Sequence, residues 1–410
     1  MNARNTFVIT VPVVVLALAL VSGSILLWQL FFLLVLVIAL SYLWTILSLH
    51  NLSVGTAKLP EHIQVGDTFQ REITVFNPDK LPRLWLKVND NADLPGHQGT
   101  AIVNIAGQSS YTWQTNFRGS KRGRYHLGPV ILTAADPLGI FTRRCTLGEA
   151  QEITVYPATL GLPLFKIGSF GNLGYGSGYR TGRGVGFNAS SVREFTSSDS
   201  THHIHWRSTA RVGKLMVKMF DADHSYNASK TVWVLVDMNK DSHFSYGEET
   251  SDEYAATIAA SVAKNQLQGG MQVGILSSDE QHGFIKPERG EEQLWNILEA
   301  LALMKTEGTL KLNESVSHHL ESFHDNPLVI IITTSASENL VETIHQLKNR
   351  VDSVEVILLD ISSFGGRPLS TEVPRTLTWS GARVYTIRRG EELAKALDSK
   401  ARNFIRYPYE

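Results

Sequence analysis

The sequence predicts a multi-domain membrane protein with an N-terminal transmembrane helical hairpin, an antiparallel β-sandwich and a doubly wound α/β domain. No Asp, Glu, Lys or Arg occurs from Phe7 to Leu49. Apolar and polar residues alternate at period two in residues 51–160, whereas apolar runs alternate with helical segments in residues 231–410. Because 410 residues exceed what one core usually supports, we expect two soluble domains beside the helices.

Two apolar segments, 7–22 and 25–48, are long enough to cross a hydrocarbon layer of ~30 Å at a rise of ~1.5 Å per residue. They predict a hairpin in residues 1–50 with both ends on one side of the membrane. Arg4 and Lys58 flank the hairpin and its turn carries no charge, so the positive-inside rule favours an inner (plasma) membrane protein, multi-pass, with cytoplasmic soluble domains. The alternative is a cleaved signal peptide with Ser22-Gly23-Ser24 as its cleavage site.

Residues 51–160 read as short strands joined by turns. Segments 68–76, 84–88 and 153–156 alternate apolar and polar residues, and no long helical pattern intervenes. This pattern is typical of a small antiparallel β-sandwich. The Gly- and Pro-containing segments 122–125, 127–129 and 136–141 are expected to be turns.

Residues 161–230 combine a glycine-rich linker with a segment dense in charged and aromatic residues. Eight glycines fall between Gly168 and Gly186, which favours a flexible connection between domains. A phosphate-binding loop using Arg180 and Arg183 is the alternative. It lacks a preceding strand and a closing Gly-Lys-Ser/Thr, so the linker is favoured.

Residues 231–410 alternate expected strands and helices, as in a doubly wound parallel sheet. In such sheets ligands bind at the carboxyl ends of the strands, here just after Val236 and Thr333. The expected strands are 231–236, 272–276, 328–333, 354–359 and 383–387. The expected helices are 251–268, 291–304, 315–323, 338–349 and 391–404.

The loop after the first of these strands carries Asp237, Asn239 and Asp241. Oxygen donors at every second residue can converge on a hard cation such as Mg²⁺. The loop resembles the metal-ion-dependent adhesion site of von Willebrand factor A domains, which begins Asp-x-Ser-x-Ser. The resemblance implies that a threonine and an aspartate from two other loops complete the site; Thr309 is a candidate, and residues 333–335 read Thr-Thr-Ser in place of Thr-Asp-Gly. The alternative is a loop whose acidic residues only cap turns and a helix.

The segment from Arg193 to Arg211 concentrates guanidinium, carboxylate, imidazole and indole groups, which favours a dedicated interaction site over a solvated surface. We expect its charged groups to brace the junction between the two soluble domains and Trp206 to be a core anchor. His202, His203 and His205 could form a metal cluster, but packed or surface imidazoles are the more frequent outcome. The candidate interdomain residues are Arg193, Glu194, Asp199, His205, Trp206, Arg207 and Arg211.

The same segment resembles the signature of the domain-of-unknown-function 58 family, which usually runs Arg-Glu-Tyr, Gly-Asp, Ile-Asp/His-Trp and Ala-Arg. The matching residues here are 193–195, 198–199, 204–207 and 209–211, followed by Leu215-Met216-Val217-Lys218. Similar proteins are bacterial or archaeal membrane proteins often encoded beside MoxR-type AAA+ ATPases. The resemblance therefore implies a membrane-anchored adaptor or scaffold with such an ATPase as partner, in a chaperone-like or assembly role.

Composition and motifs argue against several other functional classes. The 38 basic and 39 acidic residues nearly cancel, which argues against nucleic acid binding by bulk charge. One cysteine, Cys145, excludes intramolecular disulfides, and no Gly-x-Ser-x-Gly elbow follows a strand. Two further alternatives remain: an Mg²⁺-dependent hydrolase with the Asp237 loop and His205 as base, and a phospholipid-headgroup binder. The second would use the seven Arg and Lys residues from Arg180 to Lys218, where only two acids occur.

Overall fold

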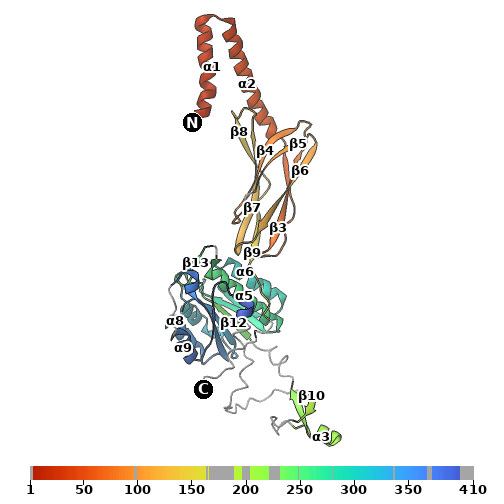
Figure 1. Cartoon of the computed structure of the whole chain (residues 1–410), viewed down its shortest axis with the longest axis vertical. Coiled ribbons are helices and arrows are strands. Elements are labelled where there is room, and N and C mark those ends of the chain that lie inside the picture. Colours follow the sequence, from red (N-terminus) through yellow and green to blue (C-terminus); the bar gives the residue numbers. More distant parts are fainter. Residues whose placement is uncertain are drawn as a thin grey trace. The chain divides into compact units, whose positions relative to one another are not determined.

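The computed structural model describes residues 3–96, 99–162, 165, 189–195, 204–220, 231–247, 249–279, 281–335, 338–366 and 372–397. The chain divides into two compact units, Met1–Tyr156 and Pro157–Glu410 (Figure 1). The first unit contains two helices and a pair of β-sheets. The second contains an α/β sheet and a small β-hairpin with one helix.

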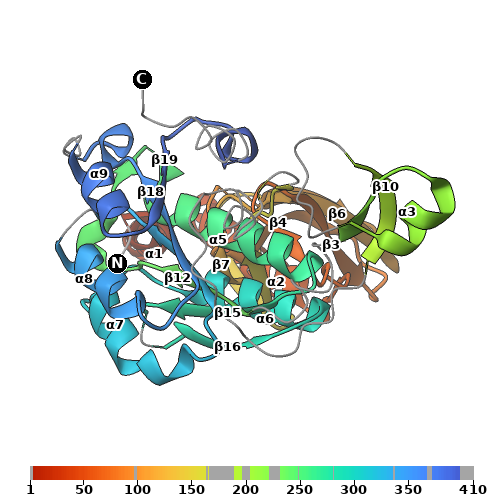
Figure 2. The ribbon, with the colours of Figure 1, turned by 90° about the horizontal axis from the view of Figure 1, so that it is seen from below.

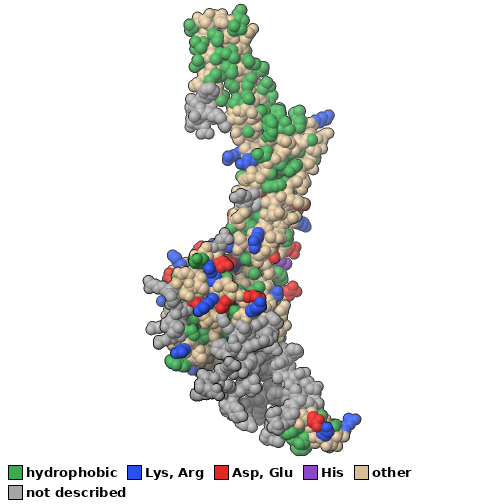
Figure 3. Space-filling view, in the orientation of Figure 1, with side chains coloured by type: hydrophobic (Ala, Val, Ile, Leu, Met, Phe, Trp, Pro, Cys, Tyr) green, Lys and Arg blue, Asp and Glu red, His purple; other side chains and the backbone are tan. Residues whose placement is uncertain are grey.

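The chain begins with helices α1 (Ala3–Ser22) and α2 (Ile25–Leu49), whose surfaces are covered by hydrophobic side chains (Figure 3). Among the described residues, α2 is the one helix long and apolar enough to cross a membrane. In α1 the apolar stretch is shorter, Thr10–Ser22. A multi-pass hairpin therefore stays a prediction.

Two sheets follow the helices, with strand orders β1-β3-β6 and β2-β9-β7-β4-β5, and β8 pairs with β7. Every pairing is antiparallel except that of β2 with β9. The strands are β1 (Ser53–Thr56), β2 (Ile63–Gln64), β3 (Thr68–Asn77), β4 (Arg83–Ala92), β5 (Thr100–Ile105), β6 (Ser109–Arg118), β7 (Gly123–Ala135), β8 (Thr142–Leu147) and β9 (Gln151–Tyr156).

Alternation along these strands builds the core between the sheets. In β3, Ile73 and Val75 are buried and pack with Leu86 and Val88 of β4. The prediction that 122–125 and 127–129 form turns is wrong, because these residues lie largely within β7. That strand is long and changes partners, pairing with β9 in its first half and with β4 and β8 in its second. Gly128, at φ 89°, lies where the partners change, so glycine here allows a backbone bend rather than a chain reversal.

The second unit contains a six-stranded sheet with the order β16-β15-β12-β17-β18-β19 (Figure 2). All its pairings are parallel except β15 with β16. The strands are β12 (Thr231–Val236), β15 (Gln272–Ser277), β16 (Phe284–Glu288), β17 (Leu328–Thr333), β18 (Ser353–Leu359) and β19 (Arg383–Ile387). The helices are α5 (Ser251–Gln268), α6 (Glu291–Leu303), α7 (Leu312–His318), α8 (Glu338–Leu347) and α9 (Glu372–Trp379).

Helices cover both faces of this sheet, which explains the continuous apolar runs of its strands. On one face, Trp233 and Leu235 of β12 pack with apolar residues of α7, α8 and α9. The antiparallel edge strand β16 was not predicted, because it is half-exposed, polar at alternate positions and contains Pro287. The helix predicted at 315–323 is instead α7 and a short 3₁₀ turn, Leu320–Ser322. Helix α9 was missed as well, and most of the helix predicted at 391–404 lies outside the described residues.

A third small element comes from the charged and aromatic segment. Strands β10 (Ala189–Glu194) and β11 (Met216–Phe220) pair antiparallel, and α3 (Trp206–Val212) lies between them in the sequence. Ile204 adds an isolated bridge to Val217 of β11. The segment is therefore a folded β-hairpin with a helical insertion.

Candidate functional site

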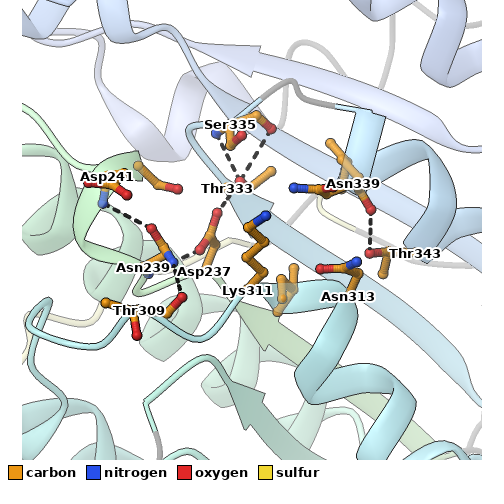
Figure 4. A pocket seen from close by; sticks show the side chains of 13 residues that line it. Asp237, Asn239, Asp241, Thr309, Lys311, Asn313, Thr333, Ser335, Asn339 and Thr343 are labelled. Atoms are coloured by element: carbon orange, nitrogen blue, oxygen red, sulfur yellow. Dashed lines mark hydrogen bonds between the residues drawn. The ribbon is translucent and has the colours of Figure 1, made fainter.

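A pocket of about 220 Å³ lies at the carboxyl ends of β12 and β17 (Figure 4). These strands are neighbours at the centre of the sheet, where the strand order reverses direction. Loops that leave such a pair diverge and open a crevice, the usual ligand site of doubly wound folds. The pocket is lined mainly by polar residues, among them Asp237, Asn239, Thr309, Lys311, Thr333 and Ser335.

Asp237 is the anchor of the pocket and is only 5% exposed. Its Oδ2 accepts a hydrogen bond of 2.8 Å from the hydroxyl of Thr333, and its Oδ1 accepts one of 3.1 Å from the backbone N–H of Asn239. The backbone N–H of Asp237 donates to the carbonyl of Ile332 at 3.0 Å. The loops after β12 and β17 are thus joined through one buried carboxylate.

Asn239 joins the first loop to a third one. Its Oδ1 accepts a hydrogen bond of 2.9 Å from the N–H of Asp241, and its Nδ2 donates to the carbonyls of Thr309 and Leu310, both at 3.0 Å. The amide is therefore held in one orientation by three backbone groups. Thr334 adds a second bond between the loops after β12 and β17, because its hydroxyl donates to the carbonyl of Ser242.

Lys311 is the only cationic side chain among the described residues that line the pocket. It is exposed, and its ammonium group reaches between Asp237 and Asn339 (Figure 4). Within the described part of the chain it forms no ion pair at 4.0 Å or less. Residue patterns could not single out Lys311, since a lone lysine before a helix is usually a solvated charge.

The predicted Mg²⁺ ligands Asp237, Asn239 and Asp241 are brought together in this pocket, and Thr309 lines it too. Their chemistry does not fit a divalent cation. The amide of Asn239 is committed to backbone groups, and Thr334 supplies a hydroxyl where the adhesion site has a carboxylate. In the described residues no three His, Cys, Asp or Glu side chains form a metal-binding group. The ammonium of Lys311 also offsets part of the negative charge of Asp237 and Asp241 that would attract a divalent ion.

The structure places the candidate interdomain residues in different environments. His205 caps the N-terminus of α3: its Nδ1 accepts from the N–H of Ser208 at 3.3 Å and lies 2.7 Å from the Ser208 hydroxyl. Trp206 is 67% exposed, so the expectation of a core anchor is wrong; it opens a seven-residue helix that has no buried residue. Arg207 and Arg211 lie on the same helix and are exposed.

Glu194 at the end of β10 forms an ion pair of 3.1 Å with Lys214. Arg193 is paired in the backbone register with Val217. Asp199, His202 and His203 lie outside the described residues. The bracing role of this segment between the two soluble domains stays a prediction.

Comparison with known proteins supports part of this picture. Residues 191–363 match the family described as "Protein of unknown function DUF58", a stretch that includes most of β10, all of α3 and the loops of Asp237 and Thr333. The chain is 19% identical over 296 residues to the uncharacterized protein YeaD of Bacillus subtilis (strain 168), covering 70% of this chain and 71% of YeaD. The predicted resemblance to the family is confirmed for this segment.

Similarity to solved structures is low. The CARDB domain of PF1109 from Pyrococcus furiosus matches at a TM-score of 0.20 and 16% identity, over 26% of this chain and 94% of that domain. The DNA glycosylase AlkC of Pseudomonas fluorescens matches at a TM-score of 0.18 and 13% identity, over 25% of this chain and 30% of AlkC. At these scores neither structure carries an argument about fold or function.

Proposed function

We propose that this protein is a membrane-anchored adaptor whose α/β unit is a von Willebrand factor A-like domain that docks a protein partner at the Asp237 pocket. The observation that carries the proposal is the convergence of three loops on that pocket through hydrogen bonds of Asp237 and Asn239. These bonds hold a recognition surface in place before any partner arrives, which reduces the ordering cost of binding.

The strand order supports the von Willebrand factor A-like assignment. β12 is central, the sheet grows outward on both sides of it, and one antiparallel strand, β16, closes an edge. The three loops also converge as the resemblance implies: the Asp237 loop after β12, the Thr309 loop before α7 and the Thr333 loop after β17.

The ammonium of Lys311 favours an acidic side chain of the partner as the docked group, since the carboxylate of Asp237 is already bonded to Thr333 and Asn239. Lys311 supplies one positive charge, and the side chains of Ser335 and Asn339 add hydrogen-bond donors around it. In a metal-containing adhesion site the cation would hold such a carboxylate. Here the ammonium of Lys311 takes that role, so docking needs no divalent ion.

Anchoring through residues 7–48 at the inner (plasma) membrane, with cytoplasmic soluble domains, belongs to the same proposal. It is supported by the length and apolar character of α2. The proposed partner is a MoxR-type AAA+ ATPase, which follows from the family resemblance. The alternative of an Mg²⁺-dependent hydrolase is not proposed, because the described residues that line the pocket include no histidine to act as base.

The test is crosslinking of the full-length protein in its own membranes, followed by purification and identification of captured proteins. We expect an AAA+ ATPase with the wild type, with and without a chelator. Lys311→Glu should reduce capture about tenfold or more, because it reverses the charge that pairs with the partner. Lys240→Glu is the matched control, since Lys240 is an exposed lysine of the neighbouring loop that does not line the pocket.

The remaining outcomes each overturn a different part of the proposal. Loss of capture in chelator would show that a metal ion mediates docking. Equal capture by wild type and Lys311→Glu would move the docking site away from the pocket. Absence of any AAA+ ATPase would remove the proposed partner.

A further inference from the structure

The end of the β-sandwich that adjoins α2 is held firmly to that helix. Ser41, Thr45 and Ser48 of α2 are buried, and the helix contacts β4, β7 and β8. The hydroxyls of Thr45 and Ser48 donate to helix carbonyls one turn earlier, at 2.9 and 2.8 Å. Small side chains with satisfied hydroxyls let the strands approach the helix closely without leaving a buried polar group unpaired.

A buried arginine adds a second connection. Arg83, 2% exposed, donates to the carbonyl of His50 at 3.2 Å and to the carboxylate of Asp79. Asp79 also accepts a hydrogen bond of 3.2 Å from the side chain of Asn51. The helix end and the sandwich therefore form one body, and the depth of α2 in a membrane sets the height of the sandwich.

The loop between β7 and β8 contacts α2. Its backbone is held by Asp136, whose carboxylate accepts from the N–H groups of Leu138 at 3.0 Å and Phe141 at 2.5 Å. The ring of Phe141 packs edge-to-face on Tyr42 of α2, with centroids 5.5 Å apart. At the tip of this ordered loop, Leu138 is 61% exposed. The backbone N–H of Leu138 is bonded within the loop, so its apolar side chain is held at the surface of the loop that contacts α2.

Tyr42 lies seven residues before Leu49, the end of α2, which is about 10 Å along the helix axis. The headgroup zone on each side of the hydrocarbon core is about 5–8 Å thick. If α2 crosses a bilayer, the Leu138 loop therefore lies at the bilayer surface. Trp85, 53% exposed at φ 53° beside a β-bulge of β4, presents an indole at the same end of the sandwich.

The charges of this end favour anionic lipid. Lys80, Arg143 and Arg144 are exposed, and among the described residues none of the three forms an ion pair. The acids nearby are already engaged: Asp79 pairs with Arg83, and Asp136 is 4% exposed within its loop. Figure 3 shows Lys and Arg side chains beside the hydrophobic surface of this end. The side chains of Lys80, Arg143 and Arg144 are thus available to bind lipid phosphate groups.

We propose that this end of the sandwich is a lipid-binding rim that rests on an anionic phospholipid bilayer. Leu138 and Trp85 enter the boundary between headgroups and acyl chains, while Lys80, Arg143 and Arg144 bind lipid phosphates. The inference rests on the proposed membrane anchor and extends it. Because α2 and the sandwich form one body, that body as a whole could still tilt in the membrane; the rim would limit this tilt and fix the orientation of the sandwich.

The test uses the full chain with Cys145→Ser and one new cysteine, Leu138→Cys, labelled with an environment-sensitive fluorophore and reconstituted in vesicles. Lipids carrying a nitroxide quencher near the headgroup report contact with the membrane. Thr68→Cys is the matched control, because Thr68 is exposed at the opposite end of β3, nine residues or roughly 30 Å from Asn77. Position 138 is exposed, so the substitution should not affect folding, which thermal unfolding of the variant verifies.

We expect strong quenching at position 138 and none at position 68. Vesicles containing phosphatidylglycerol should quench at least about twofold more than phosphatidylcholine alone, and Arg143→Gln with Arg144→Gln should abolish that difference. Equal quenching at both positions overturns the rim. An unchanged lipid difference in the arginine variant overturns the headgroup role. Extraction of the protein from vesicles by alkaline carbonate would overturn the membrane anchor itself, whereas retention with an unquenched position 138 overturns the rim alone.

Discussion

The carboxylate of Asp237 at the end of β12 accepts a hydrogen bond of 2.8 Å from the hydroxyl of Thr333 at the end of β17. Both side chains are buried, with exposed fractions of 5% and 2%. The bond joins two loops 96 residues apart in the sequence and shapes the floor of the pocket. We therefore expect the stability of the pocket to depend on this contact.

Thr333→Val should destabilise the second unit by about 1–3 kcal/mol, because a buried carboxylate loses a donor while the side-chain volume is kept. Thr309→Val is the control, since Thr309 lines the same pocket but is exposed. Urea unfolding of the two variants measures the difference. Equal free energies of unfolding for Thr333→Val and wild type would show that the bond contributes nothing.

Mg²⁺ should not bind the wild-type pocket. We expect millimolar Mg²⁺ or a chelator to leave the thermal unfolding temperature unchanged. The double variant Lys311→Ala with Thr334→Asp removes a repelling ammonium and adds a carboxylate, so it should gain Mg²⁺-dependent stabilisation. Lys240→Ala with Thr334→Asp keeps Lys311 and serves as the control. A wild type stabilised by Mg²⁺ would contradict our interpretation of the pocket.

Asp90→Asn should cost about 3–5 kcal/mol of the stability of the first unit. Arg71 and Asp90 form an ion pair of 2.6 Å with side chains only 1% and 0% exposed, and the variant leaves the buried guanidinium without a counter-charge. Glu72→Gln, at an exposed neighbour of Arg71, should change stability by less than about 0.5 kcal/mol. Chemical denaturation distinguishes the two. A loss of similar size in both variants would refute a special role for the buried pair.

The connection between α2 and the sandwich should weaken in acid. The hydrogen bond from Asn51 to Asp79, followed by those of the other neighbours, lowers the pKa of the Asp79 carboxyl despite partial desolvation. A carboxyl whose pKa is lower in the folded state stabilises that state above its unfolded pKa of about 4, and this contribution is lost as the pH falls further. Asn51→Ala should raise the pKa of Asp79 toward its ordinary value, which NMR titration of that carboxyl measures. An unchanged pKa in Asn51→Ala would show that the amide is not the cause.

Residue patterns predicted the local structure of this chain well. Continuous apolar runs located β12 and β17, strands β18 and β19 lie where mainly apolar segments predicted them, and helix α5 begins and ends where its pattern predicted. The division between a β-rich part and an α/β part could also be recognised, because each follows from a residue period that repeats within a few turns or strands. The edge strand β16 and the exposure of Trp206 could not be recognised, since both depend on what covers a surface rather than on the segment itself.

Residue patterns predicted the candidate site only in part as well. The sequence by itself located Asp237 and Thr333 at strand ends, because the carboxyl ends of parallel strands are where loops can form a site. Only the tertiary structure decided that β12 and β17 are neighbours, that Asp237 and Thr333 are bonded, and that Lys311 reaches the same pocket. Strand order and loop convergence result from contacts between residues far apart in the chain, and short-range periodicity carries no information about those contacts. The grouping of the Lys311 side chain with Asp237 and Asp241 in one pocket follows from that convergence.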